Sequence, residues 1–207
     1  MNKNKGRRKA AGQSQEKALE ACLEQAMYQW GEGFCKSPHF LNLPEAERME
    51  SESIAGFFTD MMFNYLGVTP DEWDVPSMKE CCVRYFPEKI SEGPGFFRCI
   101  VPVLSAFFSY IAEQQLQKNA GAMALEITLL HDQIMERASD PGNWGMAKRF
   151  VMAARSDGID VTDPKAFGKY LEAYNRKVLK EGPASGMFHN APYDSVIHTG
   201  KKRVRKR

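Results

Sequence analysis

Apolar side chains recur along this chain every three or four residues, which is the period of an α-helix. No stretch alternates with period two, and no Asn-Gly or Asp-Gly pair joins two β-branched runs. The sequence therefore predicts an all-α fold, an irregular bundle of about seven helices. In the first helical stripe, within residues 14–30, the following side chains share one face: Leu19, Cys22, Leu23, Ala26, Met27 and Trp30.

Glycine and proline set the expected ends of the helices. Gly31 follows the first stripe, and we expect it to end that helix. Pro44 opens a second helix that reaches Gly67, and residues 69–73 (TPDEW) predict a capping box on a short turn. A further helix begins at Pro76 and is expected to stop before Pro87, because proline lacks the N–H that a helix interior uses.

The second half of the chain gives a similar pattern. An apolar helix is expected over residues 96–117, with Pro102 marking its first turn or a kink, and another over about 121–138. Gly158 suits the left-handed position that closes a helix, and Asp163 with Pro164 caps and starts the last one. Residues 96–111 are very apolar, but 16 residues are fewer than the roughly 20 needed to span a bilayer. We therefore expect a buried core helix and no membrane span.

Beyond these helices, the two ends of the chain have little apolar surface. Residues 14–182 are expected to form one helical domain, because a chain of 207 residues suits a single domain of ordinary size. Residues 1–13 and 183–207 are expected to be disordered tails, since they cannot bury enough apolar area to offset the entropy of ordering.

Charge is distributed unevenly along the chain. The formal net charge is only +2. Five basic residues fall within residues 1–9 and six within residues 201–207, which leaves 17 basic residues against all 26 acidic residues in between. The body of the protein therefore carries a formal charge of about −9 between two basic ends.

The basic C-terminal run is the candidate nucleic-acid-binding segment, because lysine and arginine bind phosphates by releasing counterions, without reading sequence. The equally weighted alternative is a solubilising tail, or one that folds back on the acidic body. The candidate binding residues are Lys201, Lys202, Arg203, Arg205, Lys206 and Arg207.

Five cysteines, an odd number, and the lack of an apolar run after the basic N-terminus favour reduced thiols and a cytosolic location. The spacing that best suits zinc ligands in this chain is that of Cys35 and His39, with Cys22 upstream. A second close pair of ligands, which a zinc site usually has, is missing. Adjacent Cys81 and Cys82 would diverge by about 100° on a helix, so core filling is the expected role. The sequence assigns neither a metal nor a cofactor.

Sequence patterns for catalysis are also lacking. There is no Gly-x-Ser-x-Gly, no P-loop and no Gly-x-Gly-x-x-Gly, and none of the four histidines follows a glutamate by three residues. His131 and Asp132 are neighbours on a predicted helix and so point in different directions. Trp144 and Tyr170 have basic neighbours and could stack on bases, but their helical spacing favours core positions. No catalytic residue is assigned.

Two segments carry a resemblance to a known group of proteins. "FPEKIS" (residues 86–91), "DPGNWGMAKRFVMAARSDGIDVTD" (residues 140–163) and the aromatic helix that follows resemble a helical region of uncharacterised prokaryotic proteins, over about residues 60–177. Some of those proteins also carry a SEC-C-type zinc motif, which this chain lacks. The resemblance implies an all-helical fold and a prokaryotic cytosolic origin, and it transfers no catalytic residue.

Together these features predict a cytosolic helical protein that works by binding, through protein contacts, with auxiliary non-specific nucleic-acid attachment by its basic ends. Two alternatives remain open. One is an enzyme whose site is dispersed between helices, and the other is a zinc-dependent accessory protein. Substrate, partner identity and oligomeric state do not follow from the residues.

Overall fold

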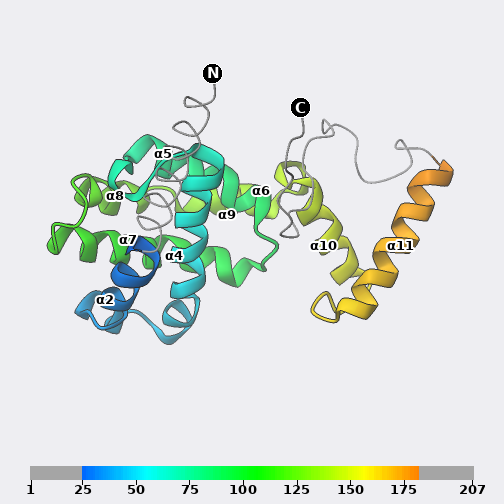
Figure 1. Ribbon diagram of the computed structural model, residues 1–207, viewed down its shortest axis with the longest axis horizontal. Helices are drawn as coiled ribbons and strands as arrows, with labels where there is room; N and C mark the ends of the chain where they lie inside the picture. The colour runs from blue at the N-terminus through cyan, green and yellow to red at the C-terminus, as the bar shows by residue number, and fades with distance from the viewer. Residues whose placement is uncertain (1–24, 182–207) are drawn as a thin grey trace, which may run out of the picture. The chain divides into compact units, whose positions relative to one another are not determined.

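The computed structural model describes residues 25–181, which contain helices and no strand (Figure 1). This confirms the all-α prediction for that part of the chain. The chain divides after Asn143 into two compact units, here called unit 1 (up to Asn143) and unit 2 (from Trp144). The expected tails at residues 1–13 and 183–207 lie outside the described residues.

Unit 1 contains most of the helices. In chain order they are η1 (Gln25–Trp30), α2 (Gly31–Cys35), α3 (Pro38–Leu41), α4 (Glu45–Leu66), η2 (Pro70–Glu72), α5 (Val75–Glu80), η3 (Cys81–Tyr85), α6 (Phe86–Lys89), α7 (Pro94–Glu113), α8 (Ala120–Ile127), α9 (His131–Ser139) and η4 (Pro141–Asn143). The segments η1 and η3 are π-helical, and η2 and η4 are 3₁₀ turns.

Helix α7 lies in the core of unit 1 and packs against α4 and α8 (Figure 1). Ten of its side chains are buried. It is long and apolar enough to pass a test of length and composition for a membrane span, as core helices of soluble proteins also do. The helix starts at Pro94, close to the expected residue 96, and Pro102 lies inside it, so of the two alternatives Pro102 does not mark the first turn.

Several helix ends follow the sequence signals. Gly67 closes α4 at φ 69°, in the left-handed region that favours glycine. The expected capping box is present at Thr69 and Glu72, where the Thr69 N–H donates to the Glu72 carboxylate at 3.3 Å. These caps pair backbone groups that the turns would otherwise leave without partners.

Three predicted boundaries are wrong. Gly31 does not end the first helix, because the helix continues to Cys35 and so buries Phe34 in the core. Pro87 does not stop the helix that begins at α5. The π-helical segment η3 changes the hydrogen-bond register, so Pro87 falls in the first turn of α6, where its missing N–H is not needed. The single helix expected up to residue 138 is divided at Thr128 into α8 and α9.

In unit 2, helices α10 (Met146–Ser156) and α11 (Pro164–Glu181) pack on each other through aromatic side chains. The Phe150 ring lies 5.1–5.4 Å, centroid to centroid, from the rings of Phe167, Tyr170 and Tyr174. Gly158 closes α10 at φ 76°, and Asp163 accepts a hydrogen bond from the Lys165 N–H at 2.8 Å, as the sequence predicts. Tyr170 therefore belongs to the packing between the two helices.

Lys148 of α10 is buried, and burial lowers its pKa from 10.5 to about 8. Its Nζ lies 5.1 Å from the centroid of the Trp144 ring. Because the unfolded chain holds this proton up to about pH 10.5 and the folded chain releases it near pH 8, stability should rise with pH across that window. We expect the free energy of unfolding of the wild-type protein to rise by about 1.5 kcal/mol between about pH 8 and pH 9.5, measured by urea unfolding.

The matched variant for this measurement is Lys148→Met, which keeps an unbranched side chain and removes the titrating group. Its free energy of unfolding should change less with pH over the same interval. An equal gain in wild type and variant would show that another group causes the pH dependence.

Candidate functional site

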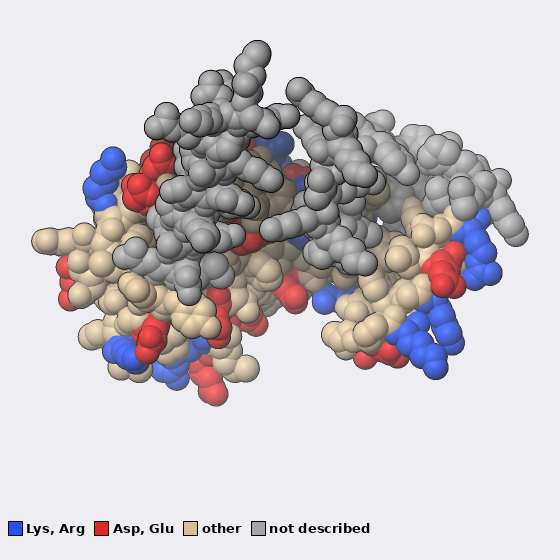
Figure 2. Space-filling view, in the orientation of Figure 1, with Lys and Arg blue, Asp and Glu red and all other residues tan. Residues whose placement is uncertain are grey.

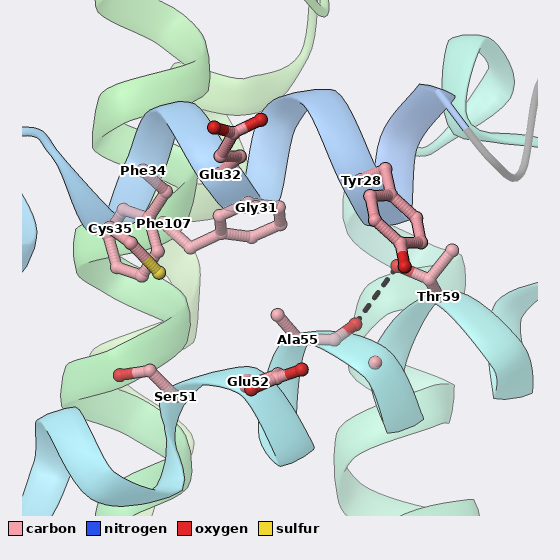
Figure 3. A pocket seen from close by; sticks show the side chains of 11 residues that line it. Tyr28, Gly31, Glu32, Phe34, Cys35, Ser51, Glu52, Ala55, Thr59 and Phe107 are labelled. Carbon is pink, nitrogen blue, oxygen red and sulfur yellow. Dashed lines mark hydrogen bonds between the residues drawn. The ribbon is translucent and has the colours of Figure 1, made fainter.

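Unit 1 contains a pocket of about 600 Å³, a volume typical of small-molecule sites. It lies between η1 and α2 on one side and α4 on the other, with α7 behind (Figure 3). Its lining consists of Tyr28, Gly31, Glu32, Phe34, Cys35, Ser51, Glu52, Ala55, Gly56, Thr59 and Phe107. One wall is partly π-helical, and π-helical segments occur frequently at functional sites.

The inner surface of the pocket is apolar. Phe34 and Phe107 are both buried, and their rings meet edge to face with centroids 5.3 Å apart. On α4, the hydroxyls of Ser51 and Thr59 donate to carbonyl oxygens of their own helix, at 2.8 and 2.9 Å. Because those protons are already used, the α4 wall offers a ligand mainly carbon surface.

The hollow exists because the side chains facing it from α4 are small. Ser51, Ala55, Gly56 and Thr59 recur at helical spacing, so they share one face of α4. A Cβ built on Gly56, or on Gly31 across the pocket, would meet no atom within 4 Å. A glycine inside a helix costs roughly 0.5–1 kcal/mol relative to alanine. Neither glycine is therefore required by close packing with the described residues.

Gly33, by contrast, has a packing role. A Cβ at this position would lie 2.1 Å from the Tyr110 hydroxyl oxygen. Tyr110 packs against Phe34, with ring centroids 6.0 Å apart. Gly33 thus lets α2 approach α7 closely, which fixes the position of Phe34 at the inner end of the pocket.

Two carboxylates border the pocket, and among the described residues that line it there is no lysine, arginine or histidine. Glu32 pairs with Lys36 at 2.5 Å, and this hydrogen bond, with the Lys36 charge, lowers the pKa of Glu32. Glu52 is exposed, and no ion pair or hydrogen bond of its side chain occurs among the residues that the structure describes. Of the two carboxylates, Glu52 is therefore the one without a cationic partner in the described part of the chain.

The Cys35 sulfur points toward the gap between α2 and α4 (Figure 3). Burial, and then the nearby Glu52 carboxylate, raise the pKa of this thiol above its ordinary value of 9.0. The thiolate is the reactive form of cysteine, so a raised pKa keeps Cys35 largely unreactive at neutral pH. This arrangement opposes a role for Cys35 as an activated nucleophile.

The zinc spacing noted in the sequence is not assembled here. Cys35 ends α2, and His39 lies on α3, where its Nε2 contacts Glu113 of α7 at 2.5 Å. Within residues 25–181, no group of three His, Cys, Asp or Glu side chains is placed to hold a metal ion. Cys22 lies outside the described residues.

Cys81 and Cys82 are both buried in η3. Burial, followed by a hydrogen bond with Cys82, raises the pKa of Cys81 well above its ordinary value. Both side chains fill the hydrophobic core of unit 1, as the sequence predicts.

The remaining candidates are not brought together. His131 is exposed at the start of α9. The tail residues Lys201, Lys202, Arg203, Arg205, Lys206 and Arg207, together with His189 and His198, lie outside the described residues.

Sequence reasoning missed the pocket. Its one visible signal was the set of small residues sharing a face of α4, and small residues also occur where helices pack closely. Comparison with known proteins adds no assignment: no family model, no curated protein and no solved structure matches this chain.

Proposed function

We propose that this protein is a cytosolic binding protein and that the pocket between α2 and α4 receives an apolar group of its ligand. The observation that carries the proposal is the pair of helical glycines in the pocket walls, Gly31 and Gly56, each with open space where a Cβ would stand. A larger residue at either position would extend into this space, so the two glycines favour a pocket that can receive a group of a ligand.

The chemistry of the lining favours binding over catalysis. The lowered pKa of Glu32 keeps it ionised near pH 7, so it is a poor general acid, and the raised pKa of Cys35 makes it a poor nucleophile. The enzyme alternative would need an acid or base with a pKa near neutrality. An apolar floor with polar groups only at the edge is instead typical of a ligand-binding cleft.

Filling the pocket tests the proposal. We expect Gly56→Leu to place its side chain in the open space and to abolish binding of 2-phenylethanol, a neutral apolar probe, detected by saturation-transfer NMR on the full chain. The variant should be more stable by about 0.8 kcal/mol, because leucine is a better helix former than glycine. Its melting temperature should therefore rise by about 2–3 °C.

The matched control is Gly168→Leu. Gly168 lies inside α11, also has open space at its Cβ position, and does not line the pocket. This variant should bind the probe as the wild type does. No detectable binding to the wild type, or equal binding to Gly56→Leu, would overturn the proposal.

The proposal retains two further expectations. One is the architecture, an irregular bundle of about seven helices, which rests on the helical period of the sequence. The other is auxiliary, non-specific nucleic-acid attachment by the basic ends, which rests on their charge in the sequence. For the zinc-dependent alternative, elemental analysis of the purified protein is the direct test.

A further inference from the structure

Given the proposed function, the charge around the pocket restricts which ligands suit it. We propose that the ligand is a small organic monocation, a protonated amine on an apolar body, whose ammonium group pairs with Glu52 while its apolar part lies on Phe34, Phe107 and Ala55.

The first argument is the balance of charge. The described lining residues provide two carboxylates and no cationic side chain, so these groups would repel an anionic ligand. Glu32 is already paired with Lys36, and its carboxylate is directed away from α4 in Figure 3. Glu52, beside Ala55 on the opposite wall, has no such partner among the described residues.

The second argument concerns the nearest basic residue on the same helix. Arg48 stands four residues before Glu52, a spacing at which side chains often pair. Its guanidinium instead donates to the carbonyl oxygen of Leu41, at 3.1 Å. Glu52 therefore remains available to a cation that enters the pocket.

The third argument is that the Glu52 charge acts inside the pocket and not only at its edge. Its field contributes to the raised pKa of the Cys35 thiol, which points into the same gap. A ligand ammonium near that position would be attracted by the same field. The described lining offers only one carboxylate without a cationic partner, and its inner surface is apolar. A ligand with a single positive charge therefore fits better than a polyamine, which carries several.

The test compares two probes that differ in charge and match closely in shape. On the full-length protein, 2-phenylethylammonium should bind about fivefold more tightly than 2-phenylethanol, measured by isothermal titration calorimetry at low salt. This factor is the upper end of the attraction that exposed ion pairs provide. Added salt should reduce the preference, because it screens exposed charges.

Two variants assign the preference to Glu52. Glu52→Gln should lose the preference and bind the two probes with equal affinity. Glu32→Gln borders the same pocket but removes a carboxylate that Lys36 already neutralises, so it should keep the preference for the ammonium within about twofold.

The outcomes separate the two proposals. Equal affinity of the wild type for the two probes, or a preference that survives in Glu52→Gln, would overturn the cation assignment and leave the apolar pocket standing. Binding of neither probe would overturn the proposed function itself.

Discussion

Replacing Trp73 with alanine is expected to lower the free energy of unfolding by about 4 kcal/mol, within the range for removing a large aromatic side chain from a core. Trp73 is fully buried. Its ring meets those of Phe58 and Trp30 edge to face, with centroids 4.9 and 5.8 Å away. The substitution would thus remove a central member of the aromatic packing in unit 1.

The backbone of Trp73 also contributes to the packing of unit 1, through hydrogen bonds. Its carbonyl oxygen accepts hydrogen bonds from the side-chain amides of Gln117 at 2.6 Å and Asn119 at 2.7 Å. These two residues lie between α7 and α8, so the segment after η2 is held to the end of the core helix. Collapse around a shortened side chain would disturb these bonds, which raises the cost above that of the lost apolar area alone.

The control is Trp73→Phe. The Trp73 Nε1 is buried with no hydrogen-bond partner, so phenylalanine loses ring area but no hydrogen bond. We expect a loss of about 1–2 kcal/mol, measured with the alanine variant by urea unfolding followed by circular dichroism. Losses of less than about 1 kcal/mol for alanine would mean that the Trp73 site is not tightly packed.

Local sequence signals predicted those parts of the fold that depend on one or two neighbouring residues. The left-handed closures at Gly67 and Gly158 follow from the freedom of glycine at positive φ. The errors at Gly31 and Pro87 have a different origin. At Gly31 the helix continues to Cys35 and buries Phe34, and burial of this kind outweighs the local preference of glycine. At Pro87 the π-helical segment η3 shifts the hydrogen-bond register, so the missing N–H is not needed there.

The sequence alone did not reveal the candidate site, because the site also depends on the tertiary arrangement. A pocket forms where the side chains of its walls are too small to fill the space between them. In a sequence, small residues such as Ala55 and Gly56 indicate close packing as readily as open space. Only the arrangement of α2 over α4 shows that nothing fills the space beside Gly56. Likewise, the sequence shows both Glu32 and Glu52, but pairing with Lys36 distinguishes them only in the folded protein.

The charge distribution, unlike the pocket, is a property of the sequence itself. On the face shown in Figure 2, acidic and basic side chains are mixed over the described part of unit 1. The basic run at residues 201–207 therefore differs in character from the visible surface of unit 1. An acidic body would also repel a nucleic acid that the basic run attracts, so attachment through that run should be weak and depend strongly on salt.

We expect the full-length protein to bind an arbitrary DNA duplex of about 30 base pairs with a slope of about −5 for log K against log salt, since six neutralised phosphates contribute about −0.9 each. Affinity should then fall by about 10³ between 50 and 200 mM salt, as measured by fluorescence anisotropy. Deleting residues 201–207 should remove most of this slope and leave the melting temperature unchanged within error.

Replacing the five basic residues within 1–9 by glutamine is the matched control, and it separates the contributions of the two ends. DNA binding that survives the deletion and is insensitive to salt would contradict attachment through the C-terminal run. If the deletion changes neither affinity nor slope, the run does not reach DNA, which is the behaviour expected of a segment held by the protein's own acidic residues.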